Sequence, residues 1–177
     1  MAATVPPPLH PELRYHTYAS FLRRRLGGNA SRVCVDGGFT CPNRDGTVGT
    51  GGCSYCNNDA FTPGIRFPGL PVGEQVRRSI GPARGEASPR RYLVYFQKFT
   101  STHATAGELR ERYHAAFSHP AVAGIVVGTR PDCLGEAVLD VLSAIARDRY
   151  VCVELGLQSV SDRVLAGMNR GHTAAAF

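Results

Sequence analysis

The segment 122–158, VAGIVVGTRPDCLGEAVLDVLSAIARDRYVCVELGLQ, decides the fold class. Its apolar run at residues 122–129 predicts a buried strand, and residues 151–158 predict a second one. Between them, residues 135–149 predict an amphipathic helix. The expected apolar stripe of this helix comprises Val138, Leu139, Leu142, Ile145 and Ala146. Two strands joined by a helix form a right-handed crossover, so we expect the sheet to be parallel.

The same alternation continues toward the N-terminus. Upstream, the sequence predicts strands at 32–36 and 91–97 and helices at 15–26, 73–80 and 106–118. After the fourth strand, a helix at 161–168 is expected to be capped by Ser161 together with Asp162. The pattern predicts an α/β fold of about four βα units. Residues 1–30 would form a leader and a short helix, and residues 31–177 the α/β unit.

The composition is that of a folded domain, with 177 residues, 43% hydrophobic and 19% charged. The net charge of +6 is carried by scattered arginines, which permit an acidic partner such as nucleic acid but equally suit a solvated surface. The sequence has no transmembrane run and no secretory signal pattern. We therefore expect a cytoplasmic protein that has no membrane partner and keeps its thiols reduced.

Three of the six cysteines share one glycine-rich loop. Cys41, Cys53 and Cys56 follow the pattern C-x11-C-x2-C within the predicted loop 37–71. A Cys-x2-Cys pair lets two thiolates reach one metal or cluster, and glycines let the backbone wrap around it. So long a loop in a compact domain is itself typical of a functional segment. The spacing therefore predicts a metal or cluster site.

The other cysteines suit packing better than ligation. A closed structural zinc site requires a fourth nearby ligand, for which Cys34 is the candidate. Cys34 lies between two valines of a predicted strand, so its side chain should point sideways into the fold. Cys133 and Cys152 are expected to be buried as small apolar side chains.

Polar and unusual residues follow each predicted strand at its carboxyl end. They are the cysteine loop, residues 97–103, residues 128–132 and residues 158–159. In parallel α/β sheets the carboxyl ends of the strands carry the ligand site. We expect the functional site at this edge.

These motifs carry a family resemblance. DGGFTCPNRDGT at 36–47 and GGCSYCNN at 51–58 resemble the radical SAM superfamily, specifically its YhcC-type bacterial branch, which is related to the elongator catalytic subunit. YFQKFTST from Tyr95, GTRPDCL from Gly128, ELGLQS from Glu154 and NRGHT from Asn169 are similar to the same branch. The similarity extends from about residue 14 to the last residue.

The resemblance implies an enzyme with a partial (β/α) radical SAM barrel. It implies a [4Fe-4S] cluster held by Cys41, Cys53 and Cys56, with one iron free to bind the amino and carboxylate groups of S-adenosylmethionine. One electron then cleaves the sulfonium and yields a 5′-deoxyadenosyl radical, which takes a hydrogen atom from the substrate. The implied S-adenosylmethionine contacts are Tyr55, Gln97, Thr100, Arg130, Glu154 and Gln158.

Several of these contacts have specific expectations. Tyr55 would pack near the cluster and the adenine. The Gly-Gly-Glu motif that usually follows the second strand is absent, and either Gln97 or Thr100 would replace it. Glu154 and Gln158 are similar to residues that meet the ribose or the amino-acid part of the nucleotide. Both are even-numbered, so we expect them on one face of the fourth strand.

For charged residues near the later motifs, the sequence leaves two roles open. Arg130 with Asp132 would orient S-adenosylmethionine or substrate, or else form a structural ion pair in a turn. Arg170 and His172 would reach the site or be disordered near the chain end. Three further histidines lack metal-ligand spacing and are expected at surface or packing positions: His103, His114 and His119.

The resemblance also bears on completeness and partners. A radical SAM core resembles a barrel of six βα units, so four units predict a truncated or incomplete product. The implied partners are a one-electron reductant such as flavodoxin or ferredoxin and, because relatives of the elongator subunit modify transfer RNA uridines, tRNA as substrate. The alternative function is a zinc-stabilised, arginine-rich nucleic-acid-binding module without catalysis.

Overall fold

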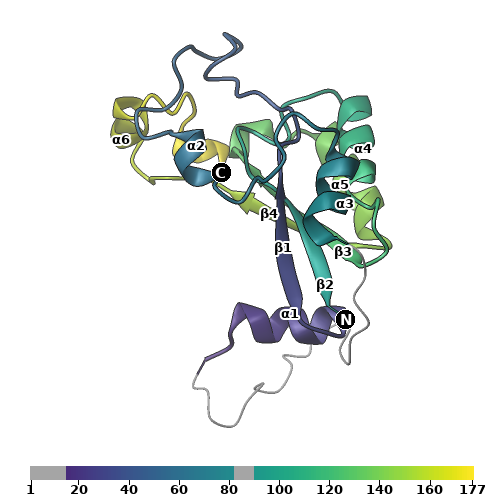
Figure 1. Cartoon of the computed structure of the whole chain (residues 1–177). Coiled ribbons are helices and arrows are strands. Elements are labelled where there is room, and N and C mark those ends of the chain that lie inside the picture. Colours follow the sequence, from purple (N-terminus) through teal and green to yellow (C-terminus); the bar gives the residue numbers. More distant parts are fainter. Residues whose placement is uncertain (1–14, 82–89) are drawn as a thin grey trace.

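A four-stranded parallel sheet forms the centre of the computed structural model, which describes residues 15–81 and 90–177 (Figure 1). The strands are β1 (Ala30–Val35), β2 (Arg91–Phe96), β3 (Val122–Thr129) and β4 (Tyr150–Leu155). Each strand pairs in parallel with the next one along the chain, in the order β1-β2-β3-β4. The predicted α/β class and parallel sheet are confirmed, whereas residues 1–14 of the predicted leader lie outside the described residues.

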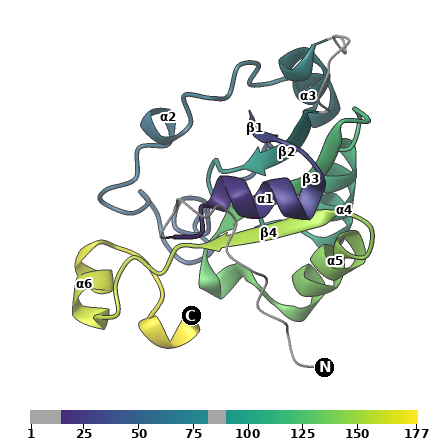
Figure 2. The ribbon, with the colours of Figure 1, turned by 90° about the horizontal axis from the view of Figure 1, so that it is seen from below.

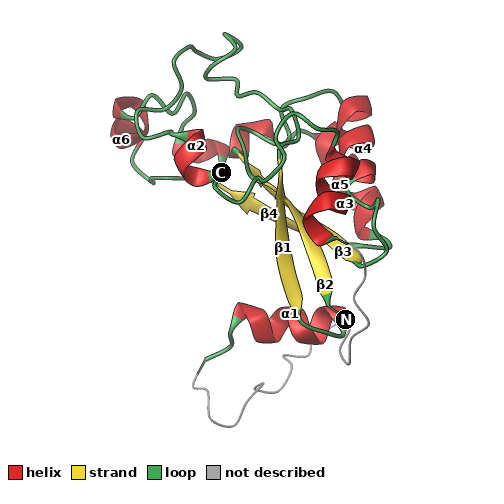
Figure 3. Ribbon diagram, in the orientation of Figure 1, coloured by secondary structure: helices red, strands yellow, loops and turns green. Residues whose placement is uncertain are grey.

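The helices divide between the two faces and the two ends of the sheet. They are α1 (Tyr18–Leu26), α2 (Asn58–Phe61), α3 (Val72–Ile80), α4 (Ala106–Ala115), α5 (Glu136–Ala146) and α6 (Asp162–Gly167). Helices α3, α4 and α5 lie together along one side of the sheet (Figures 1 and 3). Helix α1 crosses the end where the strands begin, and α2 and α6 lie at the opposite end (Figures 1 and 2).

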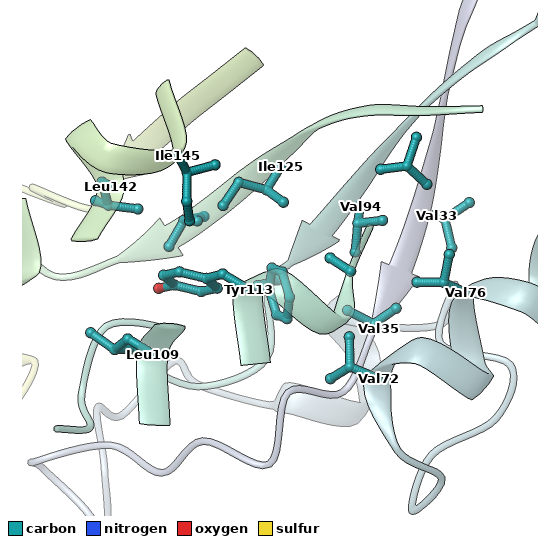
Figure 4. Packing of buried hydrophobic residues seen from close by; sticks show 14 of the residues in the cluster. Val33, Val35, Val72, Val76, Val94, Leu109, Tyr113, Ile125, Leu142 and Ile145 are labelled. Atoms are coloured by element: carbon teal, nitrogen blue, oxygen red, sulfur yellow. The ribbon is translucent and has the colours of Figure 1, made fainter. Parts of the chain in front are cut away.

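One face of the sheet carries the larger core. Strand side chains alternate between faces, and those on this face are mainly valine, isoleucine and phenylalanine. The buried cluster includes Val33, Val35, Val94, Phe96, Ile125, Val127, Leu109, Tyr113, Leu142 and Ile145 (Figure 4). Burial of this apolar surface against α3, α4 and α5 is the main source of stability.

The opposite face carries a smaller apolar cluster, and polar side chains extend from it nearer the carboxyl ends of the strands. Leu93, Tyr95 and Val126 pack there against Leu22 of α1. Glu154 and Arg32 extend from the same face, since they alternate with residues of the larger core. Helix α1 therefore covers this face where the strands begin, and the region near their carboxyl ends is free for a site.

Two predicted helix details are wrong. Leu139 and Ala146, which we placed on the buried stripe of the helix that became α5, are both exposed, Leu139 to 47%, whereas Val141 is buried. The sheet contacts α5 along the face of Val141, Leu142 and Ile145, so Leu139 faces away from it. Ser161 precedes α6 but makes no side-chain capping bond. The Asp162 carboxylate instead accepts from the backbone N–H of Ala174 at 2.7 Å.

The fourth strand is shorter than its sequence pattern. It ends at Leu155, and Gln158 has a φ of 71°, which no strand residue adopts. Glu154 and Gln158 therefore do not share a strand face, as the parity of their numbers predicted. The predicted loop 37–71 contains the short helix α2, which Asn57 caps by accepting from the N–H of Ala60. Within the described part of the chain, each helix is too short or too polar to cross a membrane.

Tyr113 joins the core to the loop after β2. Its ring is fully buried 5.2 Å from that of Phe96, and its hydroxyl donates to the Ser101 carbonyl at 2.6 Å. Tyr113→Phe leaves that carbonyl without its partner, so we expect the free energy of unfolding to fall by about 1–3 kcal/mol. Urea denaturation measures this. Tyr15→Phe, at a residue 70% exposed, is the control and should leave the unfolding midpoint unchanged.

Candidate functional site

An open cavity of about 470 Å³ lies at the carboxyl ends of the strands, with the cysteine loop forming part of its lining. Its lining contains every residue that the sequence predicted for the site: Cys41, Cys53, Tyr55, Cys56, Gln97, Thr100, Arg130, Glu154 and Gln158. It also contains side chains that the sequence did not assign to a cofactor, among them Tyr95, Phe99 and Arg170. Residues from five separate segments thus share one cavity.

The cysteine loop is folded by its own backbone. The carbonyl of Cys41 accepts from the N–H groups of Arg44 at 2.7 Å and Asp45 at 3.0 Å, and the N–H of Cys56 donates to the carbonyl of Cys53 at 3.0 Å. At Gly52, which has a φ of 79°, a Cβ atom would lie 2.7 Å from Nε of Arg44. Glycine is required there both for the backbone conformation and for the close approach of the arginine.

The segment 168–171, which follows α6, is bound to the cysteine loop. The carbonyl of Met168 accepts from the N–H of Ser54 at 3.0 Å, and the side-chain amide of Asn169 donates to the carbonyl of Gly52 at 2.8 Å. The side-chain amide of Asn43 donates in turn to the carbonyl of Asn169. These contacts fix the cysteine loop against the far end of the described chain.

Side-chain N–H groups are directed at two of the three cysteine sulfurs. Sγ of Cys53, which is 8% exposed, lies 3.6 Å from Nδ2 of Asn43 and 3.7 Å from Nη1 of Arg170. Sγ of Cys56 lies 3.5 Å from Nδ2 of Asn58. N–H donors are the partners that thiolates of an iron-sulfur cluster use. The surroundings of these sulfurs are therefore suited to negative charge.

The three loop cysteines line one cavity, and two of their sulfurs have N–H donors. Within residues 15–81 and 90–177, no three His, Cys, Asp or Glu side chains are grouped so as to hold one metal ion. Thiols with N–H donors at sulfur are the ligand chemistry of iron-sulfur clusters, so the donor types present fit such a group.

Arg130 forms an ion pair inside the cavity wall. It is 2% exposed, and its Nε and Nη2 lie 2.9 and 2.7 Å from the two carboxylate oxygens of Asp132. Burial raises the pKa of Asp132, but the hydrogen bonds and charge of Arg130 outweigh it and hold that pKa below its ordinary value. The structural ion pair that the sequence left open is therefore present, and Arg130 still lines the cavity.

Two of the residues that line this cavity, Arg130 and Arg170, have a buried nitrogen without a partner. In the described part of the chain, the buried side-chain nitrogens without a partner are Nη1 of Arg130, Nε of Arg170 and Nε2 of His172. Unpaired buried polar groups are rare and call for an explanation. Because guanidinium N–H groups bind carboxylates and phosphates strongly, an anionic ligand in the cavity would supply the missing acceptors for the two arginines.

Side chains of β1 and β2 hold Glu154. Its carboxylate lies 3.2 Å from Nη2 of Arg32 and accepts from the Tyr95 hydroxyl at 2.5 Å. The Arg32 guanidinium lies over the Tyr95 ring, 4.8 Å from its centre. Burial and the neighbouring Glu154 carboxylate raise the pKa of Tyr95, which keeps its hydroxyl protonated as a donor. The Glu154 carboxylate is therefore an acceptor held by two partners.

The remaining predicted residues line the cavity from separate segments. Thr100 is buried, and its N–H donates to the carbonyl of Thr40 at 3.1 Å, next to the first cysteine of the loop. Gln97 directly follows β2, and Gln158 follows β4. Tyr55 is 39% exposed, and burial of its hydroxyl raises its pKa to about 12.

Residues outside the predicted set include the three that reach the cysteine sulfurs. Arg170 was left open between the site and disorder, and the structure places it in the cavity wall, 6% exposed. Asn43 and Asn58 each lie two residues beyond a cysteine. For Asn58 that spacing was the available signal, because a short amide side chain there can turn back to the sulfur of Cys56. Asn43 donates instead to the sulfur of Cys53, so its spacing from Cys41 did not indicate the contact.

The other cysteines and His103 make packing or pairing contacts with the protein itself. Cys34 and Cys152 pack against the apolar cluster beneath the cavity, as predicted. Burial raises the pKa of the Cys133 thiol to about 11. His103 pairs with Asp45 at 2.8 Å, and hydrogen bonds from Thr47, followed by the contact with His103, lower the pKa of Asp45 to about 2.

The fold and the site define an α/β protein with a thiol-lined cavity at the carboxyl ends of a parallel sheet. The chain is 41% identical over 157 residues to Protein YhcC of Escherichia coli strain K12, which covers 88% of the chain and 50% of that protein. It is 40% identical over 163 residues to uncharacterized protein YtqA of Bacillus subtilis strain 168, covering 91% and 50%. It is 28% identical over 158 residues to uncharacterized protein MJ0486 of Methanocaldococcus jannaschii, covering 88% and 48%.

The chain thus spans about half the length of the curated relatives it matches. No family model matches it.

Proposed function

We propose that this chain is the cofactor-binding part of a radical SAM enzyme. One observation carries the proposal: residues that the motif resemblance assigns to the cluster and to S-adenosylmethionine, spread from Cys41 to Gln158, line a single cavity. That cavity lies at the edge of the parallel sheet where ligands of α/β folds bind.

The three cysteines of the loop would hold a [4Fe-4S] cluster. Cys41 would supply one thiolate from the start of the loop, and Cys53 and Cys56 the other two from one tight turn. Bound there, the cluster supplies the single electron for the reductive cleavage of S-adenosylmethionine. Asn43 and Arg170 would donate N–H bonds to the sulfur of Cys53, and Asn58 to that of Cys56.

Polar side chains that line the cavity would orient the nucleotide. Arg130 and Arg170 carry buried N–H groups that a carboxylate would satisfy, so they suit the amino-acid end of S-adenosylmethionine. The Glu154 carboxylate, held by Arg32 and Tyr95, would accept hydrogen bonds from ribose hydroxyls. Gln97, Thr100 and Gln158 offer further polar contacts.

Apolar side chains would exclude water around the bound nucleotide. Tyr55, Phe61 and Phe99 line the cavity and are suited to contact an adenine ring. Exclusion of water strengthens the polar contacts in the same cavity. The protein would thus supply orientation and shielding, and the cofactors the radical chemistry.

The fold in this proposal is a partial radical SAM barrel. The cavity and helix α1 lie at opposite ends of the same sheet face, while α3, α4 and α5 cover the other face. A barrel interior closed at one end and open at the site would have this arrangement. The four βα units would then be the first units of the barrel.

The proposal implies partners outside the chain. The electron would come from a one-electron carrier such as flavodoxin or ferredoxin. We propose tRNA as the substrate class, with support from the basic last turn of α1, where Arg23, Arg24 and Arg25 follow one another. The alternative, a zinc-stabilised nucleic-acid-binding module, differs from the proposal in predicting stoichiometric zinc and a colourless protein.

Anaerobic reconstitution with iron and sulfide tests the proposal. We expect about four irons per chain with broad visible absorbance. Adding S-adenosylmethionine to the reduced protein should change its electron paramagnetic resonance spectrum, because the open iron gains ligands. Stoichiometric zinc in a colourless protein, or iron that S-adenosylmethionine does not affect, would contradict it.

A further inference from the structure

The hydrogen bonds to Cys53 distinguish its sulfur from that of Cys56. Two side chains donate to Sγ of Cys53: the neutral amide of Asn43 at 3.6 Å and the cationic guanidinium of Arg170 at 3.7 Å. Sγ of Cys56 receives the neutral amide of Asn58. A positive charge is therefore in contact with the Cys53 sulfur in a buried setting, where charges are weakly screened.

Both donors are fixed by additional bonds. One hydrogen of the Asn43 amide goes to the carbonyl of Asn169, which leaves the other for sulfur. Nη2 of Arg170 donates to the carbonyl of Gly156 at 2.6 Å, and the backbone N–H of Arg170 donates to the carbonyl of Leu165 at 2.9 Å. Arg170 is thus anchored to the segment after β4 and to α6.

Gly171 allows this arrangement. It has a φ of 75°, and a Cβ atom there would overlap the Asn43 side chain and lie 2.8 Å from Cγ1 of Val48. Asn43 is 1% exposed and has no room to move away. In the sequence Asn169-Arg170-Gly171, the first residue therefore binds the cysteine loop and the second donates to the Cys53 sulfur. The third leaves room for Asn43, the other donor to that sulfur.

We propose that Arg170, supported by Asn43, is a positioning residue that raises the reduction potential of the cluster through the Cys53 sulfur. This inference rests on the proposed function. N–H bonds and positive charge at a ligating sulfur favour the reduced state, which carries one more negative charge. Arg170 adds both effects at one sulfur.

The test is a redox titration of the reconstituted cluster in Arg170→Met and in a matched control, Arg44→Met. Arg44 also lines the cavity, but it is exposed, and its Nη2 donates to the carbonyl of Cys56 at 3.2 Å and not to a sulfur. At one fixed potential, we expect R170M to lower the ratio of reduced to oxidised cluster about tenfold, which is ~59 mV for a one-electron couple. R44M should change it less than about threefold, because an exposed charge is screened.

Each outcome decides between the inference and the proposed function. If the wild-type chain forms no cluster, the proposed function fails. If the cluster forms and R170M shifts the ratio no more than R44M does, this inference fails alone. Should R170M lose its cluster while circular dichroism shows an intact fold, Arg170→Lys, which keeps the charge but not the planar donor, is titrated instead. A loss in both variants overturns the inference, because Arg170 would then be needed to hold the cluster.

Discussion

Replacing Cys53 with alanine is expected to reduce the iron bound after reconstitution from about four atoms per chain to nearly none. Cys53 is the most buried of the three loop cysteines and the sulfur with the most N–H donors. Its loss leaves two thiolates, and the buried Arg170 loses its sulfur partner. Iron and sulfide analysis with visible absorbance measures the effect.

Cys152→Ala is the matched control for this variant. Cys152 is also partly buried and lies on the same sheet face, but it packs in the apolar cluster beneath the cavity. C152A should retain the iron content of the wild-type chain. Equal iron in C53A and the wild-type chain, with both folded by circular dichroism, would remove Cys53 from the proposed ligand set.

Gly124→Ala is expected to give the largest loss of stability that we predict, about 3 kcal/mol at the upper end of overpacking costs. A Cβ atom at Gly124 would overlap the backbone carbonyl of Tyr150 and lie 2.7 Å from its carbon atom. Gly124 and Tyr150 are paired residues of β3 and β4. The backbone cannot turn aside as a side chain can, so the two strands must separate locally.

Gly128→Ala on the same strand and face is the control. Its Cβ atom would lie 3.4 Å from the carbonyl oxygen of Phe96, an ordinary contact. We expect its free energy of unfolding to stay within about 1 kcal/mol of wild type. Urea denaturation of both variants measures the difference. Equal midpoints for G124A and G128A would show that β4 is not packed over Gly124 as described.

The sheet was predictable because its strands are short apolar runs between helical patterns. Strand β3 has the bounds that the sequence predicted, Val122–Thr129, because this valine-rich run has turn-forming residues on both sides. The end of β4 did not follow the pattern. Apolar alternation continues past Leu155, but the left-handed φ of Gln158 takes the chain out of the sheet, and alternation does not record that angle.

The sequence predicted which residues line the cavity, but it did not predict the hydrogen bonds between them. Strand ends of a parallel sheet meet at one edge, so residues after each strand could be assigned to one cavity. The hydrogen bonds of Arg170 and Asn43 depend instead on how the chain after α6 returns to the cysteine loop. Pairs separated by 117 and 126 residues leave no local periodicity in the sequence.

That return of the chain sets an order of events during synthesis. The cysteines emerge from the ribosome early, yet Arg170 and Asn169, which donate to Cys53 and Gly52, each follow 117 residues later. Contacts so distant in sequence form late, after the intervening strands have paired. In a nascent chain that ends before residue 168, the cysteine loop therefore has its own backbone hydrogen bonds but lacks its contacts with residues 168–170.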